Sequence, residues 1–183
     1  TMIRWGIIGP GSIARVFCNG LRFSQTGAAV AVASRDRQKA AQFADLFSIE
    51  TVHVSYDALL ADSGVDAVYV ATIHPAHLEW VEKAAAASKH ILVEKPMGMN
   101  AVQVEAMVEA ARSNDVFLME AFMYRCHPQM QKVAELIADG AIGTVRVVRS
   151  AFGYRAGFNP DSRAYSRDLG GGGIMDVGCY PAS

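Results

Sequence analysis

Hydrophobic residues along the chain fall into two alternating patterns, short apolar runs and longer segments with helical spacing. The first run, over residues 3–8, is almost continuously apolar, which is typical of a central strand buried on both faces. Residues 11–21 then follow helical periodicity. The apolar side chains expected on one face of that helix are Ile13, Val16, Phe17 and Leu21.

The same alternation continues to about residue 120. Strands are predicted over 28–33, 51–54, 67–71, 90–93 and 116–119. Helices are predicted over 36–47 with Asp36 as N-cap, after Ser55, from Pro75 to about Ala87, and over 100–113. Repeated strand–helix units of this length require parallel strands with right-handed crossovers. The sequence therefore predicts an α/β fold with a doubly wound parallel sheet in residues 1–121.

The remaining residues, 122–183, have a different character. A helix is predicted over 128–138, followed by a strand over 144–152, where apolar residues alternate with arginines. A polar, glycine-rich loop then leads to four glycines at 170–173 and a helix from Ile174. One helix and one strand cannot close a hydrophobic core, so we expect 122–183 to be the beginning of a second domain in a longer protein.

Composition and charge narrow the class of protein. The net charge of −1 gives no electrostatic case for binding nucleic acid or an anionic membrane. No apolar run approaches the roughly 20 residues that span a bilayer. Cys18, Cys126 and Cys179 form neither a disulfide framework nor a metal motif, so we expect them to be small buried residues of a cytoplasmic protein.

A glycine-rich turn is predicted between the first strand and the first helix, where residues 9–14 read G-P-G-S-I-A. Gly9 permits a tight turn, Gly11 lets the backbone approach a pyrophosphate, and the helix N-terminus offers N–H groups. In this context the motif predicts a dinucleotide-binding cradle rather than a merely structural turn. The predicted contacts are Gly9, Pro10, Gly11, Ser12 and Ile13.

The end of the second strand bears on the choice of dinucleotide. A site specific for NAD usually places an acidic residue there to bind the ribose hydroxyls. Ser34 and Arg35 instead suit a 2′-phosphate, and Lys39 adds positive charge one turn further on. We expect NADP. NAD is the alternative if Asp36 contacts the ribose, or if the basic side chains are only solvated surface charges.

Two further segments follow predicted strands at the sheet edge where open α/β sheets bind ligands. The residues expected to line the cofactor site there are Thr72, Ile73, His74, His77, Glu94 and Lys95. Two histidines suggest zinc, but no Cys, Asp or Glu has suitable spacing, so we expect no metal and favour pocket lining or capping of the next helix. Lys95 precedes Pro96 where a nicotinamide would lie, although an ordinary surface lysine fits equally well.

The last segment holds two further candidates, Asp176 and Tyr180. Residues four apart share one face of a helix, so both side chains can point into one pocket. The glycines before them would let a substrate approach the backbone closely. The alternative is a helix in which Asp176 binds a nearby N–H group and Tyr180 packs in the core.

Six motifs occur in order along the chain: G-P-G-S-I-A, S-R-D, A-T-I-H-P-A-H, E-K-P-M-G, E-A-F-M-Y-R and G-G-G-G-I-M-D-V-G-C-Y. Together they resemble the glucose–fructose oxidoreductase/inositol dehydrogenase (Gfo/Idh/MocA) family, and most closely its NADP-dependent dihydrodiol and D-xylose dehydrogenase branch. The resemblance implies a Rossmann domain, then an α/β domain with a mainly antiparallel open sheet that forms homodimers or homotetramers. It also implies a catalytic role for Lys95, Asp176 and Tyr180, and a cofactor contact at or near Arg163.

The implied activity is hydride transfer between a nicotinamide and an alcohol or carbonyl of a sugar or cyclic diol. Tyr180 would be the general acid/base, because the Lys95 ammonium favours a phenolate and lowers the pKa of a neighbouring tyrosine. Asp176 would orient the substrate hydroxyl or the lysine. The alternatives are an anhydrosugar or keto-sugar reductase, an inositol-type dehydrogenase, and a non-catalytic NADP-binding regulator.

Overall fold

A computed structural model describes residues 2–155, 157–160 and 162–183 of the chain. The chain divides between Glu120 and Ala121 into two compact units, each treated separately below. None of the helices in the described residues is both long enough and apolar enough to cross a membrane.

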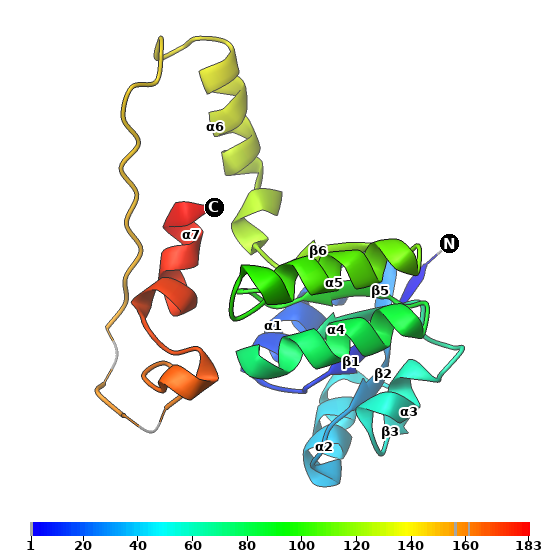
Figure 1. The fold of residues 1–183 in the computed structure, drawn as a ribbon. Coiled ribbons are helices and arrows are strands. Elements are labelled where there is room, and N and C mark those ends of the chain that lie inside the picture. The colour runs from blue at the N-terminus through cyan, green and yellow to red at the C-terminus, as the bar shows by residue number, and fades with distance from the viewer. Residues whose placement is uncertain (1, 156, 161) are drawn as a thin grey trace. The chain divides into compact units, whose positions relative to one another are not determined.

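The first unit is built on a six-stranded sheet in the order β3-β2-β1-β4-β5-β6, and every neighbouring pair of strands is parallel (Figure 1). This confirms the doubly wound α/β fold. After β3 the chain crosses to β4 on the other side of β1, so the connections that follow β1 and β4 run to opposite halves of the sheet. The strands are β1 (Ile3–Ile8), β2 (Gly27–Ala33), β3 (Thr51–His53), β4 (Ala67–Val70), β5 (His90–Val93) and β6 (Leu118–Glu120).

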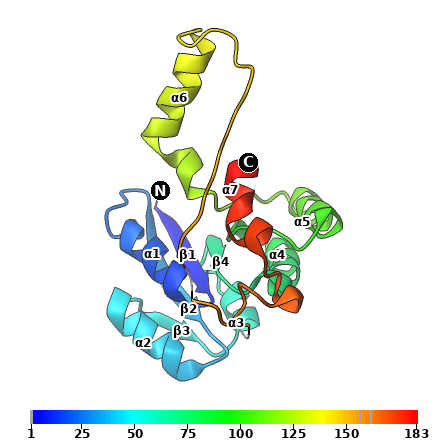
Figure 2. The ribbon, with the colours of Figure 1, turned by 90° about the vertical axis from the view of Figure 1, so that its left-hand side faces the viewer.

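Helices cover both faces of this sheet, as Figure 2 shows with α1 and α2 on one side and α3, α4 and α5 on the other. The central strands are therefore buried on both faces, which explains their apolar runs, whereas the edge strands β3 and β6 are only partly buried. Four residues of β4 and the last three of β1 are buried. The helices are α1 (Ser12–Leu21), α2 (Arg37–Phe47), α3 (Tyr56–Leu60), α4 (His77–Ala86, after a 3₁₀ turn over His74–Ala76) and α5 (Ala101–Ser113).

Side-chain caps begin most of these helices. The carboxylate of Asp36 accepts hydrogen bonds from the N–H groups of Gln38 and Lys39, and the Ser55 hydroxyl accepts one from Ala58, as predicted. Asn100 caps α5 in the same way. Helices α1 and α4 lack a side-chain cap, and the N-cap residue of α1 is Gly11.

Two details of the first unit differ from the sequence predictions. Ile13 and Val16 are 38% and 61% exposed, whereas the small side chains of Ala14 and Cys18 face the core because α1 packs close to the sheet. The last strand begins at Leu118 rather than Val116. The Val116 N–H still bonds the Ala111 carbonyl at the end of α5, so this residue belongs to the turn.

The second unit contains α6 (Pro128–Ala138) and a C-terminal helical segment that begins with a π turn over Ile174–Gly178 and continues as α7 (Cys179–Ala182). The predicted strand over 144–152 is wrong, since those residues form no strand and lack a partner ladder in the described part of the unit. The antiparallel sheet is accordingly not formed by the described residues. Cys126 is exposed and Cys179 half-exposed, against the expectation of burial.

Candidate functional site

The turn after β1 requires glycine at position 9. Gly9 has φ +90°, a conformation that costs a residue with a side chain about 1–3 kcal/mol. A Cβ atom there would also lie 2.9 Å from the carbonyl oxygen of Ala71, at the end of β4. The loops after β1 and β4 therefore pack so closely that position 9 requires glycine, whether or not a ligand is bound.

Gly11 has no such reason to be glycine. Its backbone is extended, with φ −88° and ψ −169°, and a Cβ atom built on it would meet nothing within 4 Å. Open space therefore lies against the backbone at the uncapped N-terminus of α1. Such a terminus carries a partial positive charge and unsatisfied N–H groups, so a pyrophosphate fits the cradle that a side chain at Gly11 would fill.

Asp36, the acidic residue that follows β2, already makes contacts within the protein. Asp36 caps α2, and its carboxylate lies 3.8 Å from the ammonium of Lys39. The Ser34 hydroxyl accepts a hydrogen bond from the Asp36 N–H at 3.1 Å. Arg35 is exposed beside Tyr56, where its charge opposes the burial that raises the pKa of that tyrosine. Basic side chains thus remain at the surface of this edge.

His77, predicted to line the cofactor site, lies in the interior of the first unit. It is completely buried; its Nδ1 atom lies 3.1 Å from the Pro96 carbonyl oxygen and 3.2 Å from that of Met97. Its Nε2 atom lies 3.2 Å from the carbonyl oxygen of Thr72. The ring therefore ties the loop after β4 to the loop after β5. The Thr72 Oγ1 atom is buried and has no hydrogen-bond partner among the described residues.

Burial lowers the pKa of His77 below its ordinary value of 6.5. Below that pH the unfolded chain binds a proton that the folded protein resists. The free energy of unfolding should therefore fall as the pH drops from about 7 to about 5. Denaturant unfolding across this range should show a shallower fall for His77→Gln than for the wild type. Parallel curves for the two proteins would contradict this assignment.

In the described residues no group of three or more His, Cys, Asp or Glu side chains lies close enough together to hold a metal ion. His74 is also buried, and its ring centroid lies 5.8 Å from that of His77. The two imidazole rings lie edge to face, and the ring nitrogens of His77 lie beside carbonyl oxygens.

Lys95 leaves the carboxyl end of β5, in a loop fixed by its neighbour Glu94. One carboxylate oxygen of Glu94 accepts a hydrogen bond of 2.5 Å from the Tyr69 hydroxyl on β4. The other accepts from the Lys95 backbone N–H at 3.1 Å. Glu94, predicted as a cofactor contact, therefore supports the loop, while the Lys95 side chain is half-buried at the ligand-binding edge of the sheet.

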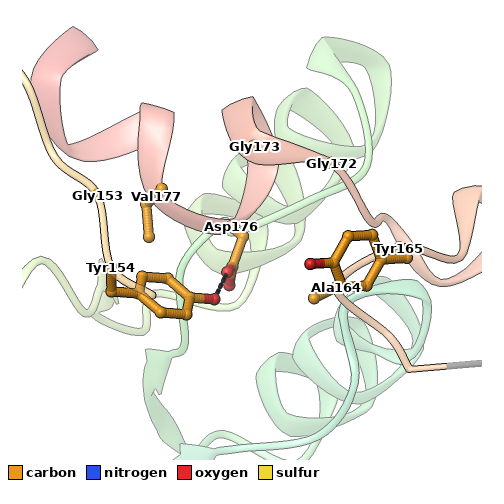
Figure 3. Close-up of a pocket in the computed structure, with 8 residues that line it drawn as sticks. All are labelled: Gly153, Tyr154, Ala164, Tyr165, Gly172, Gly173, Asp176 and Val177. Carbon is orange, nitrogen blue, oxygen red and sulfur yellow. Dashed lines mark hydrogen bonds between the residues drawn. The ribbon is translucent and has the colours of Figure 1, made fainter. Parts of the chain in front are cut away.

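The second unit contains a pocket of about 210 Å³ around Asp176 (Figure 3). Asp176 is only 8% exposed; its carboxylate accepts a hydrogen bond from the Tyr154 hydroxyl and lies 3.8 Å from the Arg163 guanidinium. The carboxylate raises the pKa of Tyr154. Figure 3 shows the rings of Tyr154 and Tyr165 on either side of Asp176. The pocket thus offers a hydrogen-bonding carboxylate between two aromatic rings, a lining suited to hydroxyl groups on a ring.

Tyr180 is not among the residues that line this pocket. Its ring packs edge-on against Phe122 and Phe152, with centroids 5.6 and 5.1 Å away, and near Tyr124. Tyr180 lies in α7, directly after the π turn that carries Asp176. The shared site of Asp176 and Tyr180 stays a prediction, and Lys95 belongs to the first unit.

The parallel sheet and the open cradle at the N-terminus of α1 define a dinucleotide-binding α/β protein. A family model described as "Oxidoreductase family, NAD-binding Rossmann fold" (GFO_IDH_MocA) matches residues 3–122, and one described as "GFO/IDH/MocA C-terminal domain" matches residues 130–183. The chain belongs to the Gfo/Idh/MocA oxidoreductase family. This confirms the family indicated by the motifs.

Individual relatives agree with the branch expected from the sequence. The trans-1,2-dihydrobenzene-1,2-diol dehydrogenase of Mus musculus is 43% identical over 180 residues, which are 97% of this chain and 54% of the relative. The D-xylose 1-dehydrogenase (NADP(+)) 2 of Haloferax volcanii is 43% identical over 155 residues, 85% of this chain and 47% of the relative. The chain therefore spans about half the length of the curated relatives it matches.

Among solved structures, the 3-ketoreductase KijD10 from Actinomadura kijaniata, in complex with NADP and TDP-benzene, has a TM-score of 0.84 and 35% sequence identity. The match covers 99% of this chain and 55% of KijD10. The likeness therefore extends over both units of the chain.

Proposed function

We propose that the chain is the cofactor-binding part, with the start of the substrate domain, of an NADP-dependent oxidoreductase acting on a sugar or a cyclic diol. The observation that carries the proposal is the open cradle at Gly11, where an uncapped helix N-terminus is left for an anion. The names of the relatives support both the cofactor and the class of substrate.

In this proposal the backbone over Gly9–Ile13 binds the pyrophosphate, and Ser34, Arg35 and Lys39 bind the 2′-phosphate. Thr72 and Ile73 line the cofactor site. The Ile73 side chain, in the loop after β4, is 41% exposed. When bound, the nicotinamide donates or accepts the hydride. The protein must then supply the geometry and the proton transfer.

We assign the proton transfer to Tyr180, with the Lys95 ammonium favouring its phenolate form. Asp176 would orient a substrate hydroxyl, supported by Tyr154 and Arg163, which already contact its carboxylate. The chemistry requires Lys95 of the first unit to meet Tyr180 of the second in the working enzyme. That meeting is part of the proposal.

Two observations bear on the substrate. The pocket at Asp176 places aromatic rings beside a carboxylate, which suits both the apolar face and the hydroxyl groups of a sugar or dihydrodiol. A keto-sugar reductase is the second candidate, favoured by the likeness to KijD10. A regulator without catalysis would need the cradle but not Lys95.

The full-length protein should be tested by following reduced-nicotinamide absorbance with NADP or NAD against pentoses, hexoses, inositol, trans-dihydrodiols and 3-keto sugars. Turnover with NADP and an aldopentose or dihydrodiol supports the main proposal, and reduction of a keto sugar supports the second. Tight NADPH binding without turnover across the panel would leave only the regulator.

The cofactor assignment makes a separate prediction at Arg35. Replacing it by alanine removes charge-assisted hydrogen bonds to the 2′-phosphate and should weaken NADPH binding by about 10- to 100-fold. NADH affinity should stay the same, because NADH lacks that phosphate. Fluorescence titration of both cofactors measures the ratio, with Arg37→Ala, which removes an exposed charge two residues away, as the matched control. Equal losses for both cofactors would contradict the assignment.

A further inference from the structure

The loop from Glu94 to Met99 is held at successive backbone groups by side chains of the surrounding elements. The Lys95 N–H bonds Glu94, the carbonyl oxygens of Pro96 and Met97 face His77, and the Met99 N–H donates to Gln103. A loop supported in this way has few alternative conformations, although residues 94–99 form neither helix nor strand.

Glu120 contacts the loop just after Lys95 and Pro96, at the backbone of Met97. Its Oε1 atom accepts a hydrogen bond of 2.7 Å from the Met97 N–H. In the sheet Glu120 lies beside Val93, the last residue of β5. The chain therefore leaves β5, presents Lys95, and two residues later is bound back to the neighbouring strand by this one carboxylate.

This contact is stronger than an ordinary loop hydrogen bond. The acceptor is a carboxylate, the donor is a backbone amide, and Glu120 is only partly exposed, so water competes poorly for either group. Glu120 opens the motif E-A-F-M-Y-R, to which the proposed function gives no task. Its carboxylate holds the backbone two residues after Lys95.

We infer that Glu120 is a positioning residue for Lys95, an inference that rests on the proposed role of Lys95. Glu120 acts through the Met97 backbone, which sets where the Lys95 side chain emerges from the sheet edge. A displacement of about 1 Å in a reacting group can lower a rate by about 100-fold. Loss of the Glu120 contact therefore reduces catalysis without touching the cofactor cradle at Gly11.

The kinetic test compares Glu120→Ala with Glu120→Gln in the full-length protein. The alanine variant should lower kcat by about 10- to 100-fold, with the NADPH dissociation constant and substrate KM within about twofold of wild type. Glutamine retains a carbonyl oxygen that accepts from Met97, so it should restore most of kcat. Glu105→Ala removes the same charge from an exposed position on α5 and should leave kcat unchanged.

A second readout does not depend on turnover. The chain contains five lysines, which reductive methylation with ¹³C-formaldehyde labels as dimethyl-lysine, and a Lys95→Arg variant identifies the Lys95 resonance. In Glu120→Ala this resonance alone should shift or broaden, and in Glu120→Gln it should return to its wild-type position. An unchanged Lys95 resonance and kcat in the alanine variant would overturn the inference. If the wild-type protein turns over no substrate, the proposed function fails, while the resonance still decides the role of Glu120.

Discussion

Removing the hydroxyl of Tyr180 should lower kcat of the full-length protein by about 10²- to 10⁴-fold, the range that general acid–base catalysis contributes. Tyr180→Phe keeps the ring that packs against Phe122 and Phe152, so the fold should be unaffected. Lys95→Ala should produce a loss of similar size, because the phenolate then lacks its neighbouring positive charge. The NADPH dissociation constant should change little in either variant.

Stopped-flow or steady-state absorbance gives kcat, and fluorescence titration gives NADPH affinity. Tyr124→Phe is the matched control, since it removes a hydroxyl that bonds Ser183 from a tyrosine of the second unit that does not line the Asp176 pocket. If Tyr180→Phe turns over at the wild-type rate, the tyrosine is a packing residue, as its aromatic contacts alone would suggest. If cofactor affinity falls as much as the rate, Lys95 and Tyr180 bind the cofactor rather than transfer the proton.

Most elements of the first unit could be predicted because its strands and helix starts are recognisable from the local sequence. Strands buried on both faces are continuously apolar, and helix starts such as Asp36 and Ser55 are marked by the side chain that caps them. The burial of α1 was harder to predict. Hydrophobicity favours Ile13 and Val16 as its buried face, whereas the short distance to the sheet admits only small side chains such as Ala14.

The second unit was predicted less well because alternation is a local signal and strand pairing is not. Residues 144–152 have the pattern of a strand, but a strand also needs a neighbour to bond with. The hydrogen bond from Tyr154 to Asp176 joins residues 22 positions apart in the chain, where no periodicity indicates which side chains meet. The contact between Glu120 and Met97 likewise depends on the register of β5 and β6.

Gly9 and Gly11 belong to one motif, yet their substitutions should have opposite consequences. Gly11→Asp places a side chain in open space on an extended backbone and adds an N-cap to α1. Asp is at least as good an N-cap as Gly, so the free energy of unfolding should stay within about 0.5 kcal/mol of wild type or rise. The new carboxylate fills the cradle and repels the pyrophosphate, so NADPH affinity should fall by about 100-fold or more.

Gly9→Ala is the converse case, because position 9 has φ +90° and faces the Ala71 carbonyl. It should destabilise the protein by about 1–3 kcal/mol from backbone strain, or about 2–4 °C in Tm for each kcal/mol in a chain of this length. Thermal unfolding measures the stability of both variants, and NADPH titration measures their cofactor affinity. Wild-type NADPH affinity in a folded Gly11→Asp would show that the cradle does not hold the cofactor. Loss of stability in that variant would instead mean that Gly11, like Gly9, is required by the fold, and the argument from open space would fail.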